Sequence, residues 1–159
     1  MARLTHNVDV VRRAFRAGFA DELPAIAAKA SRKVASDVVR ETCVGISGGV
    51  PGLPQRIDTG RYRAAWAMGA LKIGQPAKGV STKGATSADA TTEVSSGRSG
   101  TRVVVQNNVS YGPYVEMGTA TMEPGNHLTR ALGVVAQGIP LKELKDDLAR
   151  DLAAAWQGA

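Results

Sequence analysis

Apolar positions spaced three and four residues apart dominate the first part of the chain. From residue 7 to residue 44 they form one amphipathic stripe, and the basic side chains lie off it, as in a surface helix. Pro24 interrupts the stripe, because a proline inside a helix removes one hydrogen bond and clashes with the preceding turn. The pattern therefore predicts either one long helix that is kinked near Pro24 or two helices that meet near residues 21–24.

Glycine and proline follow this stripe and predict a loop. Residues 45–55 hold four glycines and two prolines, which exclude a regular element. Beyond the loop, the side chain of Asp58 or Thr59 is expected to cap a short helix over residues 60–65. Residues 66–73 are expected to form a strand, although their alternation of large and small side chains is imperfect.

The segment from residue 74 to residue 100 differs from the rest in composition. It is rich in Gly, Ser, Thr and Ala, and it has almost no large apolar side chain. Burial of such a segment offsets little of the entropy lost on ordering it. The sequence predicts a long flexible loop or a projecting hairpin, with residues 91–95 as one arm, that orders only against a neighbouring protein.

The last third of the chain returns to regular periodicity. Three consecutive valines make residues 101–108 the clearest strand. A short turn or helix over 111–117, a loop, and helices over 128–137 and 141–157 follow. The predicted fold is α+β in one domain of 159 residues, with the long N-terminal helix packed on a small antiparallel sheet and helices at the C-terminal end.

Charge is distributed unevenly over a chain of net charge +6. Residues 1–63 carry 11 Lys/Arg against 6 Asp/Glu, residues 64–110 carry 5 against 2, and residues 111–159 carry 4 against 6. Such asymmetry is typical either of contact with nucleic acid or of a basic face that meets the acidic face of a neighbouring subunit. The second interpretation is favoured, because the chain contains no dense basic run.

Candidate catalytic groups are few. Cys43 and His127 could form a nucleophile–base pair, as in a small hydrolase. However, a lone thiol in an amphipathic helix is typically buried, and a histidine beside a helix start is expected at the surface or in a cap. Asp58 and Glu116 could be a catalytic carboxylate pair, but the pattern does not place them near each other. Asp58 is therefore expected to cap a helix, and Glu116 to lie in an ion pair or an interface. No enzyme, metal site or cofactor is predicted, and no segment is apolar enough for a membrane span or signal peptide.

A basic DNA-binding protein is the alternative function. Arg61, Tyr62, Arg63 and Trp66 place cations and aromatic rings on one short helix, and such pairs can grip single strands. Aromatic residues at helical spacing more often pack into a core, and that interpretation is favoured here.

Two segments are more specific than these single residues. The first is IDTGRYRAAW, residues 57–66, and the second is VSYGPYVEMGT, residues 109–119, followed by LTRAL at 128–132. Their order and spacing resemble the phage head–tail connection family, the siphophage neck or tail-completion proteins that include minor tail protein Z of phage lambda. Tyr62 stands where the family commonly has Leu. The residues that carry the motif are Asp58, Thr59, Gly60, Arg61, Trp66, Tyr111, Tyr114, Glu116, Gly118 and Thr119.

The resemblance implies a structural virion protein at the head–tail junction, assembled in the host cytoplasm. It implies a homo-oligomeric ring, a hexamer or dodecamer, that joins the capsid connector or adaptor to the tail terminator or tail tube around the DNA channel. The motif residues are expected to hold the fold. Tyr111 and Tyr114 are expected to share a helical face against the sheet, and Gly118 is expected to end the turn at positive φ.

Overall fold

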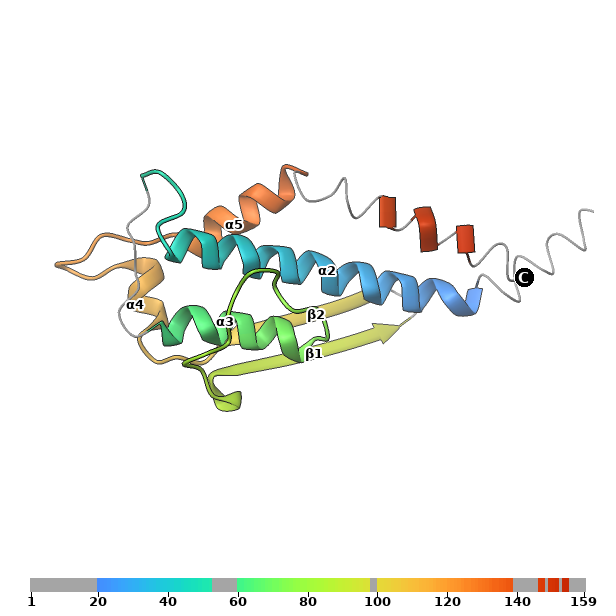
Figure 1. Ribbon diagram of the computed structural model, residues 1–159, viewed down its shortest axis with the longest axis horizontal. Coiled ribbons are helices and arrows are strands. Elements are labelled where there is room, and N and C mark those ends of the chain that lie inside the picture. The colour runs from blue at the N-terminus through green and yellow to red at the C-terminus, as the bar shows by residue number, and fades with distance from the viewer. Residues whose placement is uncertain are drawn as a thin grey trace, which may run out of the picture.

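A helix of 27 residues, α2 (Ala20–Ile46), runs along the middle of the protein in the computed structural model (Figure 1). The structure describes residues 20–52, 60–97, 100–138, 146–147, 149–151 and 153–154. On one side of α2 lies α5 (His127–Ala136). On the other side lie α3 (Arg61–Lys72) and a hairpin of β1 (Ala90–Gly97) and β2 (Gly100–Asn107). The fold is therefore α+β, as the sequence predicts.

The hairpin is the whole sheet within the described residues. Its antiparallel register runs from Ala90 opposite Asn107 to Gly97 opposite Gly100, so the turn falls at residues 97–100. Both strands pack against α2 and α3, which gives the sheet one covered face. Two strands alone are marginal in water, and these helices supply the apolar surface that a hairpin needs.

The long helix matches its prediction within the described residues. α2 contains Pro24 and continues to Ile46, two residues beyond the expected end. The helix is continuous across residues 21–24, where two separate helices would have met. The part of the prediction before Ala20 lies outside the described residues. Gly48 takes φ 74 in the turn that follows α2, which is the conformation that a glycine accepts without strain.

The strand predicted over residues 66–73 is wrong. These residues form the second half of α3, which extends from Arg61 to Lys72. The run of small residues misled the prediction, because its pattern alone does not distinguish a helix from a strand. In the structure they let α3 approach the sheet closely: a Cβ added at Gly69 would overlap the Cγ1 atom of Val105.

The segment over 74–100 is only partly as predicted. Its second half forms η2 (Ser87–Asp89) and β1, so the hairpin is present and longer than the expected arm of residues 91–95. In its first half, Ala77 is 5% exposed and belongs to the core, and Val80 and Ala85 pack against that core.

The later elements follow the predicted order. β2, α4 (Gly112–Met117) and α5 lie within one residue of their expected bounds. Residues 146–147, 149–151 and 153–154 are helical, in agreement with the helix predicted over 141–157, and the rest of that helix lies outside the described residues.

The core lies where α2, α3 and the start of α4 meet. It is built from β-branched, aromatic and small side chains: Val39, Cys43, Ile46, Tyr62, Ala65, Trp66, Ala70, Ala77, Val109 and Val115. Both aromatic residues of α3 are buried in it, so the core interpretation of Tyr62 and Trp66 is confirmed.

Candidate functional site

The two motif segments meet at the side chain of Glu116. This residue lies on α4, and its Oε1 atom accepts a hydrogen bond of 3.1 Å from the Tyr62 hydroxyl on α3. Its Oε2 atom accepts a hydrogen bond of 3.0 Å from the backbone N–H of Leu128, in the first turn of α5. Asn126, the residue at the N-cap of α5, makes no side-chain cap of its own. Glu116, on α4, therefore caps the N-terminus of α5 and links α3, α4 and α5 through its hydrogen bonds.

Aromatic rings and an amide complete this junction. The ring of Tyr62 lies 6.2 Å from those of Trp66 and Tyr111, measured between centroids. The side-chain amide of Asn107, at the end of β2, donates 2.8 Å to the backbone carbonyl of Tyr62. Its oxygen accepts 3.0 Å from the N–H of Val109. Nothing in the local sequence pattern around Asn107 pointed to this contact with α3.

Gly112 and Gly118, in the second motif, stand where a larger side chain would overlap neighbouring atoms. A Cβ at Gly112 would lie 2.7 Å from Cε2 of Tyr62, so the aromatic ring needs a glycine there. Gly118 ends α4 at φ 76, as the sequence predicted, and turns the chain toward α5. Backbone hydrogen bonds from Gly125 to the Val115 carbonyl and from Asn126 to the Glu116 carbonyl then fix the start of α5.

The first motif holds a second contact, between Arg61 and Asp89. The guanidinium of Arg61 binds both carboxylate oxygens, at 3.1 Å and 2.5 Å, although the Asp89 side chain is only 5% exposed. The N–H of Thr86 donates a further 2.7 Å bond to the same carboxylate. The hydrogen bonds from Arg61, and next that from Thr86, hold the pKa of Asp89 well below its usual range. Asp89 was not predicted as part of a contact, because it lies in the segment that was expected to be flexible.

Several motif residues stand apart from these contacts. The N-cap position of α3 is held by Gly60, at φ 74 and without a side-chain cap of its own. Asp58 and Thr59, one of which was predicted to cap this helix, lie outside the described residues. Tyr114 is 59% exposed whereas Tyr111 packs on Tyr62, so the shared face predicted for the two tyrosines is wrong. Thr119 is exposed and pairs with Met122 in a tight turn.

Cys43 and His127, the possible catalytic groups, are both buried. Cys43 is 1% exposed, and its thiol donates to the Arg63 carbonyl. Burial raises the pKa of this thiol to about 12, which disfavours the nucleophilic thiolate. His127 is fully buried, so the surface position expected for it is wrong. Among the described residues, no group of three His, Cys, Asp or Glu side chains could hold a metal ion.

The basic and aromatic groups of α3 do not form one exposed surface. Tyr62 and Trp66 point into the core, Arg61 is bound to Asp89, and Arg63 donates 2.9 Å to the Ser47 hydroxyl. Stacking on a nucleic-acid base requires an exposed ring beside the cation. The arrangement that suggested a single-strand grip is therefore absent from α3.

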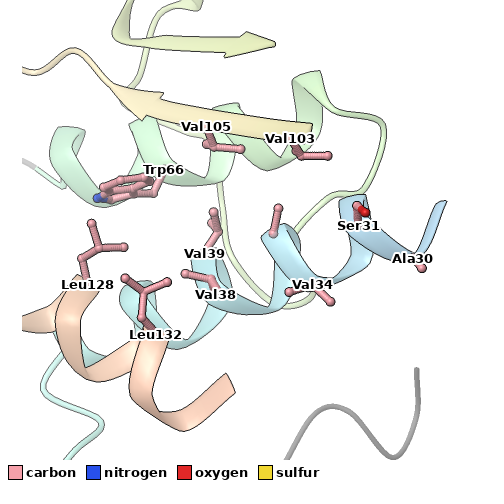
Figure 2. A pocket seen from close by; sticks show the side chains of 11 residues that line it. Ala30, Ser31, Val34, Val38, Val39, Trp66, Val103, Val105, Leu128 and Leu132 are labelled. Carbon is pink, nitrogen blue, oxygen red and sulfur yellow. The ribbon is translucent and has the colours of Figure 1, made fainter. Parts of the chain in front are cut away.

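An open apolar groove of about 560 Å³ lies beside this junction (Figure 2). One wall is α2, one is β2 with Trp66 of α3 beside it, and the third is α5, whose Leu128 points toward Trp66 (Figure 2). Leu132 is 52% exposed. The lining residues are Ala30, Ser31, Val34, Ala35, Val38, Val39, Trp66, Val103, Val105, Leu128 and Leu132.

Comparison of the chain with protein-family models, with curated proteins and with solved structures found no match. Within the part of the chain that the structure describes, no helix has the length and apolar character needed to cross a bilayer.

Proposed function

We propose that this protein is a structural subunit of a phage head–tail junction, a neck or tail-completion protein that forms a homo-oligomeric ring. The observation that carries the proposal is the meeting of the two resemblance segments at Glu116. One residue from each segment takes part in a hydrogen bond there: Tyr62 and Glu116, which lie 54 residues apart in sequence. A motif whose residues hold helices together fits a protein selected for its shape and its contacts.

The chemistry of the described residues agrees with a structural role. The thiol of Cys43 is buried, and the carboxylates of Asp89 and Glu116 both accept hydrogen bonds from partners within the fold. These groups therefore lack the free, mutually positioned arrangement of an acid–base pair. In a cyclic ring each subunit uses two different faces. The basic excess of residues 1–110 and the acidic excess of residues 111–159 are the candidates for those faces.

Light scattering and negative-stain imaging of the purified protein test the ring. A closed hexamer or dodecamer, alone or on the ends of isolated tails, is the expected result. Particles assembled in a host without this gene are expected to accumulate as separate heads and tails. Normal virions from that host would refute the joining role.

The alternative, a DNA-binding protein, makes a different prediction. Affinity for free duplex would fall steeply with salt, because each phosphate contact releases a counterion. Several cations of the described residues are already in ion pairs, among them Lys29, Arg61 and Arg130. Weak binding to free duplex is therefore expected, and tight salt-dependent binding by a monomer would favour the alternative.

A further inference from the structure

Two exposed apolar surfaces lie on different elements of the protein. The first is the groove between α2, β2 and α5, where the side chain of Leu132 is half exposed (Figure 2). The second is on α4, where Tyr114 is 59% and Met117 is 71% exposed. Neither of these two side chains lines the groove. Exposed apolar surface that is gathered in patches marks sites of contact with other proteins.

Tyr114 and Met117 together form what we call the α4 patch. They lie three residues apart on α4, so they are neighbours on one side of this helix. The helix lies at the end of the protein where α2 ends (Figure 1). Tyr and Met are enriched in protein–protein interfaces, and an aromatic side chain that fills a pocket on the partner is a frequent anchor there. The α4 patch therefore has the composition of an interface anchor.

The groove has the size and lining to receive such an anchor. Its volume of about 560 Å³ lies within the range of roughly 300–1,000 Å³ that is typical of pockets for small ligands. Val34 and Val38 of α2 and Val103 of β2 are only partly buried where they line it. Filling the groove with Tyr and Met side chains would remove apolar surface of both partners from water, which is favourable.

The two surfaces also differ in charge. The segments that form the groove walls, residues 30–39, 100–107 and 127–136, carry four Lys/Arg against one Asp/Glu. Residues 111–126, which include the α4 patch, carry Glu116 and Glu123 and no Lys or Arg. Arg102, next to Val103 in sequence, is exposed and has no ion pair among the described residues. The groove of one subunit is therefore complementary in charge to the α4 patch of another.

We propose that the apolar groove is the docking surface for the α4 patch of a second copy of this chain. Tyr114 and Met117 of one subunit occupy the groove of the next, beside Leu132, and apolar burial and opposite charge both contribute to the contact. Each subunit offers one surface of each kind, and such a heterologous contact generates a ring where the rotation between subunits closes. The inference rests on the proposed ring and names its interface.

Substitutions on each surface test this contact in the full-length protein. Leu132→Asp places a charge in the groove, and Met117→Asp places one in the α4 patch, where burial of an unpaired charge is costly. Light scattering of the original protein comes first. At a concentration where it has the mass of a ring, both variants are expected to have the mass of a monomer.

Leu71→Asp is the matched control. Leu71 is 48% exposed on α3 and lies outside both surfaces, so this variant is expected to keep the mass of the ring. Circular dichroism checks that every variant is folded. Tyr114→Asp is a second variant of the α4 patch, and it is expected to behave as Met117→Asp does.

Mixing the two variants tests whether the contact joins different surfaces. Leu132→Asp keeps the α4 patch and Met117→Asp keeps the groove, so each of these subunits has one working surface. An equimolar mixture is expected to form a species of twice the monomer mass that grows no further, whereas either variant alone stays monomeric.

Four results would overturn the docking while the proposed ring stands. They are a ring retained by Leu132→Asp or by Met117→Asp, a ring lost in Leu71→Asp as well, a mixture that stays monomeric, and a dimer formed by one variant alone, which would indicate contact between identical surfaces. An original protein that forms no ring would instead overturn the proposed function together with this contact.

Discussion

At the scale of the residue, Glu116 connects the two sequence motifs more directly than any other side chain described. One oxygen accepts from the Tyr62 hydroxyl, and the other caps the N-terminus of α5. Removing an acceptor leaves a buried donor without its partner, which costs more than the hydrogen bond itself contributed.

Glu116→Ala is therefore expected to lower the free energy of unfolding by about 1–3 kcal/mol. Glu116→Gln keeps one oxygen acceptor and is expected to lose less. Urea denaturation of the two variants measures the difference. Tyr62→Phe, which removes one donor and leaves the cap of α5, serves as the matched control. Equal stability of Glu116→Ala and the original protein would contradict the junction.

Asp89 predicts a specific response to acid. Its pKa is depressed in the folded protein, so its contribution to stability is complete above the unfolded value of 3.8 and is lost as the pH falls toward the folded value. The melting temperature of Asp89→Asn should lie below that of the original protein at pH 7, and the two should converge below pH 3.8. A gap that stays constant from pH 7 to pH 2 would contradict the contact with Arg61.

Cys43 is expected to be inert in the native protein. A thiol with a pKa of about 12 that is 1% exposed presents almost no thiolate at pH 8. A chromogenic disulfide reagent should label it at least a hundredfold more slowly in buffer than in urea. Rapid labelling of the native protein would reopen the hydrolase hypothesis that the burial of Cys43 disfavours.

At the scale of the element, periodicity predicted the long helix, β2, α4 and α5 because each has a clear apolar stripe or a β-branched run. It failed over residues 66–73, where the contact with Val105 that requires a glycine at position 69 is invisible in local sequence. The junction was predictable only in part. Tyr62 and Glu116 stand in the two motifs, but their partners, Asn107 for the Tyr62 carbonyl and the Leu128 N–H for Glu116, become neighbours only through tertiary packing.

Gly69 tests the close packing of α3 on β2. Alanine is the better helix former by about 1 kcal/mol, so an exposed site would be stabilised by Gly69→Ala. Here the added Cβ overlaps the Val105 side chain, and a net loss of about 1–3 kcal/mol is expected. Thermal unfolding of Gly69→Ala with and without Val105→Ala measures the coupling. The second change should recover part of the loss; stabilisation by Gly69→Ala alone would contradict the close approach.

At the scale of the whole molecule, the charge distribution bears on assembly. Residues 1–110 hold 16 Lys/Arg against 8 Asp/Glu, and residues 111–159 hold 4 against 6. In a ring, such halves would meet between neighbouring subunits, and attraction between exposed charges is screened beyond about 10 Å at 0.1 M salt.

The proposed ring is therefore expected to be sensitive to salt. The average mass from light scattering should decrease between 0.05 M and 0.5 M NaCl at constant protein concentration. Sucrose at matched osmolality is the control, because it does not screen charge. A mass that rises with salt would indicate that apolar contact, and not opposite charge, holds the subunits together.

The junction at Glu116 also has a consequence for the order in which the chain folds. Its contact with Leu128 closes a loop of 12 residues, whereas its contact with Tyr62 closes one of 54. The entropy lost on closing a loop grows with loop length, and short loops close sooner. The corner between α4 and α5 is therefore expected to form first, as a local unit, and to present a fixed carboxylate on which α3 then docks.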